Sequence, residues 1–158
     1  MVIPGVYAPQ EDTALLAVAL SEEPFPPGAA VLDVGTGTGA LALAAARRGG
    51  RVTAVDVSRR TVCNARLNAA RAGLRVRVRR GNLFDPVRGE SFDPILANPP
   101  YVPAPGGTCP PRGAARAWDA GHDGRMALDR ICEEVPPYCG PRGYCSWCNL
   151  RSAIRSGP

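Results

Sequence analysis

The sequence predicts an α/β fold, a doubly wound, mostly parallel sheet that is incomplete at its C-terminal end. Strand-length apolar runs alternate with helical stretches, which is the pattern of βαβ units. The first of these strands runs directly into a glycine-rich turn, and polar residues follow several later strands. Ligands bind at the carboxyl ends of parallel strands, so these residues are expected to share one edge of the sheet. The 158 residues leave room for one domain with a real core.

The expected elements follow one another through short connections. Gly73 marks the end of one helix, and Pro94 is tolerable only at the first position of its strand, because proline donates no backbone hydrogen bond. A Pro/Gly-rich loop over residues 103–113 precedes the last helix. The sequence predicts helices over residues 12–21, 40–46, 60–72 and 125–134, and strands over residues 30–34, 51–56, 75–80 and 94–97.

A glycine-rich turn follows the first strand. Residues 35–39 read Gly-Thr-Gly-Thr-Gly and open a helix, a pattern that lets the backbone approach a ligand closely. With Asp56 at the end of the second strand, the same pattern satisfies the dinucleotide-binding fingerprint, in which a carboxylate binds the ribose. The turn by itself therefore leaves a nicotinamide-dependent enzyme open.

The most informative motif is Asn-Pro-Pro-Tyr at residues 98–101, directly after the fourth strand. Proline has no N–H and forces the residue before it into an extended conformation, so the Asn98 side chain and the Pro99 carbonyl point outward as two acceptors. Two such acceptors are suited to hold both hydrogens of a planar –NH2 group while its nitrogen attacks an electrophile. This motif decides against the nicotinamide enzyme.

Several separated motifs together resemble one family. Residues 33–39, an acid after the second strand and residues 98–101 resemble the class I S-adenosylmethionine-dependent methyltransferases, and more closely the HemK-type glutamine methyltransferases. Residues 6–13 are similar to the opening segment of the compact release-factor branch, and residues 117–130 to its segment after the catalytic turn. The resemblance covers residues 6–136 and implies a Rossmann-like fold with S-adenosyl-L-methionine as the cofactor.

The resemblance also implies roles for individual residues. Asn98 and Pro99 would accept the hydrogens of the attacking amide, and Tyr101 would pack against the planar substrate. Asp33 and Asp56 have a plainer reading as caps of their turns, but two carboxylates beside a glycine loop favour a ligand. The expected catalytic and substrate-binding residues are Asn98, Pro99, Pro100 and Tyr101, and the expected cofactor-binding residues are Thr13, Asp33, Gly35, Gly37, Gly39, Asp56, Asn82 and Leu83.

The resemblance thus implies an enzyme that methylates N5 of a glutamine in the Gly-Gly-Gln motif of a peptide chain release factor. The runner-up is adenine-N6 methylation of DNA or RNA, because an exocyclic –NH2 presents the same two hydrogens. A reading of another class is a cofactor-binding remnant or interaction module without turnover. A small activating partner protein is a further expectation. Nothing resembles a signal peptide or a membrane span, which favours the cytoplasm.

The charge pattern has two readings. The net charge is +5, and every basic residue apart from the single histidine is an arginine. Arg75, Arg77 and Arg79 alternate with valines, which fits either a nucleic-acid patch or a charged edge strand that resists pairing with other chains. The edge strand is preferred, because no aromatic residues interleave with the arginines to stack bases. Nucleic acid is therefore the less favoured partner.

The C-terminus departs from the expected fold and divides the chain into a methyltransferase domain, residues 1–136, and an aberrant, poorly packed tail, residues 137–158. A fifth apolar strand should follow the last helix, but residues 138–148 are rich in Tyr, Cys, Gly and Ser. One reading is a zinc site formed by Cys132, Cys139, Cys145 and Cys148. The preferred reading, with no metal, is a reading-frame change near Pro137. Codons for Tyr, Cys and Trp begin with T, and a one-base shift moves that T to the middle position, where it specifies apolar residues.

We expect restoration of the frame after Pro137 to raise the free energy of unfolding by several kcal/mol. Each fully buried large aliphatic side chain contributes about 1.5–3 kcal/mol before conformational entropy is subtracted. Sequencing the source gene and comparing thermal melting of the two chains test this. Stoichiometric zinc binding, with unfolding by chelators, would instead identify the cysteines as a metal site.

Overall fold

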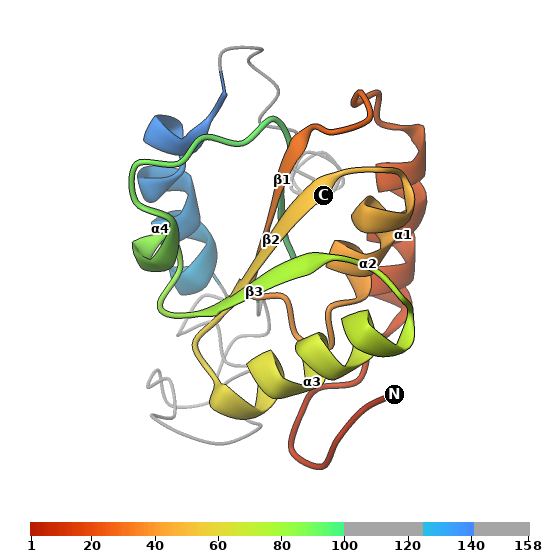
Figure 1. Cartoon of the computed structure of the whole chain (residues 1–158). Helices are drawn as coiled ribbons and strands as arrows, with labels where there is room; N and C mark the ends of the chain where they lie inside the picture. Colours follow the sequence, from red (N-terminus) through yellow and green to blue (C-terminus); the bar gives the residue numbers. More distant parts are fainter. Residues whose placement is uncertain (100–124, 141–158) are drawn as a thin grey trace, which may run out of the picture.

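The computed structural model describes residues 1–99 and 125–140, and this part of the chain forms a parallel α/β sheet. Its strands are ordered β3-β2-β1-β4, and every pairing between neighbours is parallel (Figure 1). The strands are β1 (Ala30–Val34), β2 (Arg51–Asp56), β3 (Val76–Arg80) and β4 (Ile95–Ala97). The helices are α1 (Glu11–Glu22), α2 (Ala40–Arg47), α3 (Arg59–Arg71) and α4 (Met126–Glu134), with short 3-10 turns η1 (Asp85–Val87) and η3 (Pro136–Tyr138).

The sheet lies between two layers of helix. Helices α1, α2 and α3 cover one face, and α4 covers the other (Figure 1). Side chains of alternate strand positions therefore point into two separate cores, as a doubly wound sheet requires. This arrangement confirms the predicted fold class.

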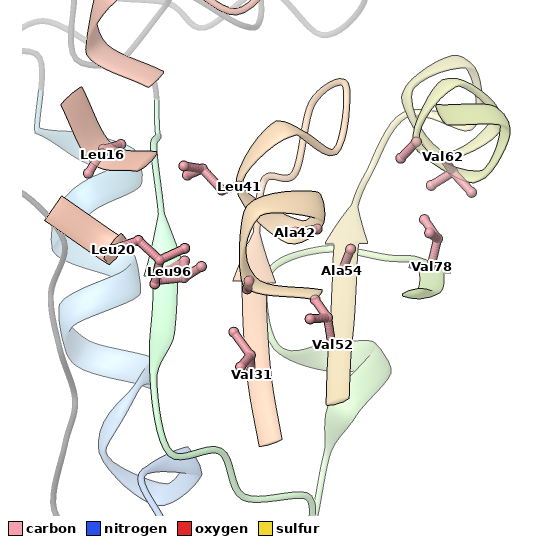
Figure 2. Close-up of a cluster of buried hydrophobic side chains, with 12 residues drawn as sticks. Leu16, Leu20, Val31, Leu41, Ala42, Val52, Ala54, Val62, Val78 and Leu96 are labelled. Carbon is pink, nitrogen blue, oxygen red and sulfur yellow. The ribbon is translucent and has the colours of Figure 1, made fainter. Parts of the chain in front are cut away.

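The larger core joins the sheet to α1, α2 and α3. Leu16 and Leu20 of α1 pack with Leu96 of β4, and Val62 of α3 packs towards Val78 of β3 (Figure 2). On the opposite face a second cluster brings α4 and η1 against the sheet. Its buried members are Leu32, Val34, Val55, Phe84, Val87, Phe92, Ile95, Ile131 and Val135.

The helices and strands agree with the sequence predictions to within about two residues, the usual uncertainty of element ends. Gly73 follows α3 with φ of 65°, a left-handed conformation that suits glycine after a helix. Pro94 lies just before β4, where its carbonyl accepts a hydrogen bond from the amide of Leu32 at 3.1 Å. Proline therefore stands just before the first residue of β4, where its missing N–H does least harm.

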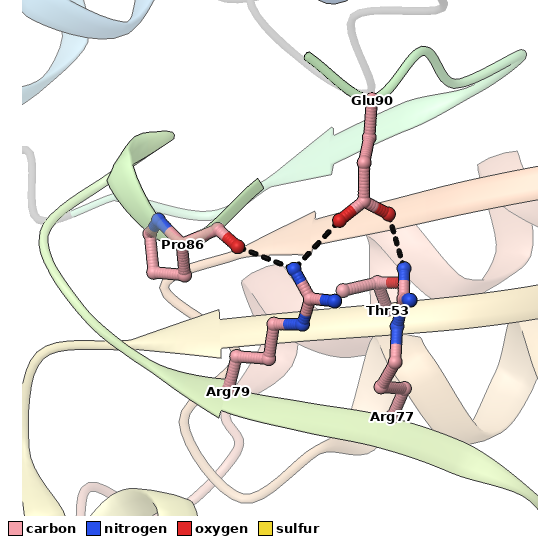
Figure 3. Close-up of polar contacts among 5 residues, drawn as sticks. All are labelled: Thr53, Arg77, Arg79, Pro86 and Glu90. Carbon is pink, nitrogen blue, oxygen red and sulfur yellow. Dashed lines mark hydrogen bonds and ion pairs between the residues drawn. The ribbon is translucent and has the colours of Figure 1, made fainter. Parts of the chain in front are cut away.

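Strand β3 is at one edge of the described sheet, and two of its arginines are paired with one acid. Arg77 and Arg79 both form ion pairs with Glu90, and Arg77 also donates to the hydroxyl of Thr53 at 3.0 Å (Figure 3). Arg79 additionally donates to the carbonyl of Pro86. These contacts favour the edge-strand reading of the arginine pattern, because Glu90 partly neutralises the charge that a phosphate would need.

The chain returns to the sheet after α4. The backbone amide of Phe92 donates to the carbonyl of Tyr138 at 2.8 Å, and the amide of Gly140 donates to the carbonyl of Phe92 at 2.7 Å. Phe92 and Cys139 form a parallel bridge, and the Tyr138 ring stacks on Phe84 with centroids 4.6 Å apart. These residues thus pack on the sheet where a fifth strand would begin. The proposed division at residues 136 and 137 stays a prediction.

Among the helices of residues 1–99 and 125–140, none has the length and apolar character needed to cross a bilayer.

Candidate active site

The predicted site residues gather at the carboxyl ends of β1, β2 and β4. Asp33 lies in β1, Asp56 is the last residue of β2, and Asn98 follows β4 directly. Because β1 lies between the other two strands, its turn is central to this edge of the sheet. This is the position at which parallel α/β proteins bind ligands.

The turn between β1 and α2 is built on glycines in the left-handed conformation. Gly35, Gly37 and Gly39 have φ values of 71°, 57° and 85°. At Gly39 a side chain would also lie 3.3 Å from the β-carbon of Ala65, so the turn packs directly on α3. Most other residues would be strained there, which explains the glycine pattern.

Hydrogen bonds to the buried side chain of Asp33 fix this turn in place. Its carboxylate is buried, with 1% of the residue exposed, and Oδ2 accepts hydrogen bonds from the Thr36 hydroxyl at 2.5 Å and the Ala42 amide at 3.1 Å. Burial raises the pKa of Asp33 to about 6; the bonds from Thr36 and Ala42 oppose the rise, and the Asp56 carboxylate adds to it. Asp33 thus fastens strand, turn and helix together. Its predicted contact with a cofactor stays a prediction.

Asp56 is oriented by backbone amides on both sides. Oδ2 accepts from Gly37 at 3.2 Å and Oδ1 accepts from Ser58 at 2.9 Å. A carboxylate oxygen has more than one lone pair, so it can accept hydrogen bonds from a backbone amide and from a ligand at the same time. The structure therefore places Asp56 at the turn with a fixed orientation.

The turn is poorly suited to a pyrophosphate. The amides of Gly35 and Thr36 both donate to the carbonyl of Val55, while those of Gly37 and Ala42 donate to carboxylates. Donors that would cradle a phosphate already have acceptors, and two carboxylates would repel it. A ligand with positive charge fits this electrostatic setting better, which also argues against the nicotinamide alternative.

Asn98 is held by the start of α1. Its Nδ2 lies 3.1 Å from Oδ2 of Asp12 and 3.4 Å from Oγ1 of Thr13. Oδ1 of Asp12 in turn accepts from the amide and the hydroxyl of Thr13, at 2.6 and 3.2 Å. Thr13 was predicted to bind the cofactor, and the structure places it beside Asn98, which was predicted to accept hydrogen bonds from the substrate. Asp12 was not predicted, although it adjoins Thr13 in the segment that carries the resemblance.

Sequence reasoning also missed two asparagines of α3. Asn68 donates to the carbonyls of Thr38 and Met1, both at 2.9 Å, and fully buried Asn64 accepts from the amide of Ile3 at 2.7 Å. They tie the first residues and the glycine turn to α3. The sequence feature that could have identified them is their i,i+4 spacing, which puts two side-chain amides on the buried face of α3 beside Val62, Ala65 and Ala69.

The segment after β3 carries Asn82 and Leu83, two of the residues predicted to bind the cofactor. Leu83 has φ of 42°, and it is the one non-glycine with positive φ in residues 1–99 and 125–140. The carbonyl of Asn82 accepts from the amide of Asp85 as η1 begins. A bulky residue held in a disfavoured conformation is often found at a functional site.

Some predicted residues lie outside the part of the chain that the structure describes. These are Pro100, Tyr101, the loop over residues 103–113, and Cys145 and Cys148 of the zinc alternative. Cys132 is an exposed free thiol, and Cys139 packs against the hydrophobic cluster that contains Phe92 and Ile131. Within the described residues no group of three or more His, Cys, Asp or Glu side chains is placed to hold a metal.

Comparison with known proteins identifies relatives that are methyltransferases. A profile of the methyltransferase small domain matches residues 3–106. The chain is 35% identical over 155 residues to a release factor glutamine methyltransferase of Geobacter sulfurreducens, covering 91% of this chain and 53% of that protein. It is 36% identical over 136 residues to a putative protein N5-glutamine methyltransferase of Methanocaldococcus jannaschii, covering 85% of this chain and 67% of that one.

A solved structure agrees in fold. The 16S rRNA N2 G1207 methyltransferase of T. thermophilus, in complex with AdoMet and guanosine, superimposes with a TM-score of 0.59 at 29% identity. The match covers 74% of this chain and 33% of that one. The chain therefore spans about half the length of the Geobacter relative and a third of this structure.

Asp33 should make the unliganded protein less stable as the pH rises through the mildly acidic range. The unfolded chain releases this proton near 3.8, whereas the folded chain keeps it up to a pKa of about 6. The folded state binds more protons in that window, so the free energy of unfolding should fall by about 2 kcal/mol between about pH 4 and pH 6. Urea denaturation across this range, compared with Asp33→Asn, measures the effect. Equal pH dependence in both proteins would contradict it.

Proposed function

We propose that this chain methylates the side-chain nitrogen of a protein glutamine. The chain belongs to the methyltransferase small domain family and is a HemK-type class I S-adenosylmethionine-dependent methyltransferase. The observation that carries the proposal is Asn98 at the end of β4, with its Nδ2 turned to α1. Pro99 follows Asn98 in the sequence, and the residue after Pro99 is also a proline. That second proline has no N–H with which to donate a hydrogen bond.

The residues present fit a sulfonium cofactor. Asp33 and Asp56 bring negative charge to the turn, and the turn's amides are already bonded within the protein. S-adenosyl-L-methionine would supply a methyl group on positively charged sulfur, which such a site favours electrostatically. Asp56 is proposed to bind the ribose hydroxyls. The methionine end is assigned to Thr13, Asp33 and Gly35 of the turn region, and the adenine to Asn82 and Leu83.

The chemical task of the protein is alignment. An amide nitrogen is a poor nucleophile because its lone pair is delocalised into the carbonyl. If Asn98 Oδ1 and the Pro99 carbonyl accept its two hydrogens, the nitrogen is held in one orientation and its lone pair is directed at the methyl group. Formation of the N–C bond would leave a positively charged, strongly acidic nitrogen, which would lose one of these hydrogens as a proton to water, so no strong base is needed. Tyr101 is assigned to packing against the planar amide.

The names of the relatives favour glutamine over adenine as the acceptor. The Gly-Gly-Gln motif of a release factor is the proposed substrate, and an activating partner protein and a cytoplasmic location remain expectations. Adenine-N6 methylation stays the second candidate, since Asn98 would serve an exocyclic –NH2 equally well. The Arg77 and Arg79 ion pairs with Glu90 weigh against a nucleic-acid substrate at that edge.

We expect Asp56→Ala to weaken cofactor binding by about 2–3 kcal/mol, because it removes hydrogen bonds between a charged carboxylate and the ribose. Isothermal titration calorimetry with S-adenosylmethionine measures the change. Asp85→Ala is the matched control, since Asp85 is an exposed carboxylate that forms an ion pair with Arg88. Unchanged affinity in Asp56→Ala would remove this residue from the site.

We expect Asn98→Ala to lower turnover by about a hundredfold or more while cofactor affinity stays nearly intact, the scale seen when one preorganised polar contact to a transition state is lost. Transfer of labelled methyl groups to release factor and to an adenine-containing oligonucleotide measures both turnover and substrate choice. Labelling of the oligonucleotide alone would support the second candidate. Cofactor binding without labelling of either would indicate a protein that does not turn over.

A further inference from the structure

We propose that Asp12 is a positioning residue that sets which end of the Asn98 amide faces the substrate; this rests on the proposed function of Asn98. The contact joins residues 86 positions apart, from the first turn of α1 to the end of β4. A carboxylate accepts hydrogen bonds and cannot donate them. The Asn98 group at 3.1 Å from Asp12 Oδ2 must therefore be the NH2, and Oδ1 is turned the other way.

The orientation matters because the two ends of an amide side chain are nearly equal in size. A flipped Asn98 would fit the same space but would point two N–H donors at the N–H groups of the incoming nitrogen. Packing alone cannot prevent such a flip, whereas a carboxylate on one side can. Thr13 Oγ1, 3.4 Å from the same nitrogen, supports this orientation through Asp12: it donates its single hydrogen to Asp12 Oδ1 and so can only accept from Asn98.

Asp12 is itself fixed in place. Its Oδ1 accepts from the amide of Thr13 at 2.6 Å and from the Thr13 hydroxyl at 3.2 Å. It lies in the first turn of α1, where the helix dipole favours a negative charge. Both carboxylate oxygens are thus occupied, one by α1 and the other by Asn98.

The contact should also make Asn98 a better acceptor. When the NH2 group donates to a charged carboxylate, electron density shifts through the conjugated amide towards Oδ1. A more negative Oδ1 binds an N–H more strongly, and the effect is greatest where water is excluded. Asp12 therefore acts on the reaction through Asn98, without touching the reacting atoms.

The first test observes the contact without any methyl transfer. In 15N-labelled protein, the side-chain NH2 resonances of Asn98 are assigned by their loss in Asn98→Ala. Asp12→Ala should shift these proton resonances upfield, because a charge-assisted hydrogen bond is lost. Glu11→Ala is the matched control, an exposed acid in the same helical turn, and should leave them unchanged. Unchanged Asn98 resonances in Asp12→Ala would overturn the proposal.

The second test is kinetic and uses a double-mutant cycle. Asp12→Ala should lower kcat about ten- to a hundredfold, with cofactor affinity within about twofold of the parent, and should have no further effect in Asn98→Ala protein. Asp12→Asn keeps a carbonyl that can accept from Asn98 and should recover part of the loss. Equal losses in both backgrounds, or a loss of cofactor affinity, would overturn the positioning role.

The two tests separate this inference from the function on which it rests. If the parent protein methylates neither glutamine nor adenine, the proposed function fails, and the resonance shifts still decide whether Asp12 orients Asn98. If glutamine is methylated and the shifts are absent, the function stands and the positioning role of Asp12 is wrong.

Discussion

The hydrogen bonds of the buried Asp33 carboxylate organise the carboxyl end of the sheet. Asp33 belongs to β1, the strand that pairs with both β2 and β4, and its Oδ2 binds the Thr36 hydroxyl and the Ala42 amide. Strand, turn and helix are thereby fixed to one another before any ligand arrives. The charge is kept in a dry position at a cost in stability that an apolar residue would not have, which is typical of functional sites.

From this turn the site extends to both sides through backbone amides and short polar bridges. Gly37 binds Asp56 at the end of β2, and Asn68 connects Thr38 to α3. On the other side, α1 brings Asp12 and Thr13 to Asn98. One helix thus contacts the predicted acceptor residue and also carries a predicted cofactor residue. This proximity suits a reaction in which a methyl group passes directly from donor to acceptor.

The sequence predicts the local elements well and the long-range polar contacts poorly. Strand and helix positions follow from apolar periodicity, the turn from its glycines, and Asn98 from the prolines after it. The contact between Asp12 and Asn98 could not be predicted in this way, because it depends on how α1 packs on the sheet. Asn64 and Asn68 were missed for a similar reason, since their acceptors come from the N-terminal residues and the glycine turn. Periodicity assigns such asparagines to a buried face but does not identify their partners.

The order of the strands in the sheet has a consequence for synthesis on the ribosome. Strand β1 pairs with β2 soon after both have emerged, but its other edge waits for β4, and the contact between Ala30 and Asp93 spans 63 residues. During that interval the most buried strand of the domain exposes one row of unpaired backbone groups and part of its apolar surface. Parallel pairings of this separation form slowly and leave nascent chains open to aggregation. This edge of β1 therefore stays unpaired until Ile95–Ala97 have emerged, and a chaperone that covers apolar strands would act on it in that interval.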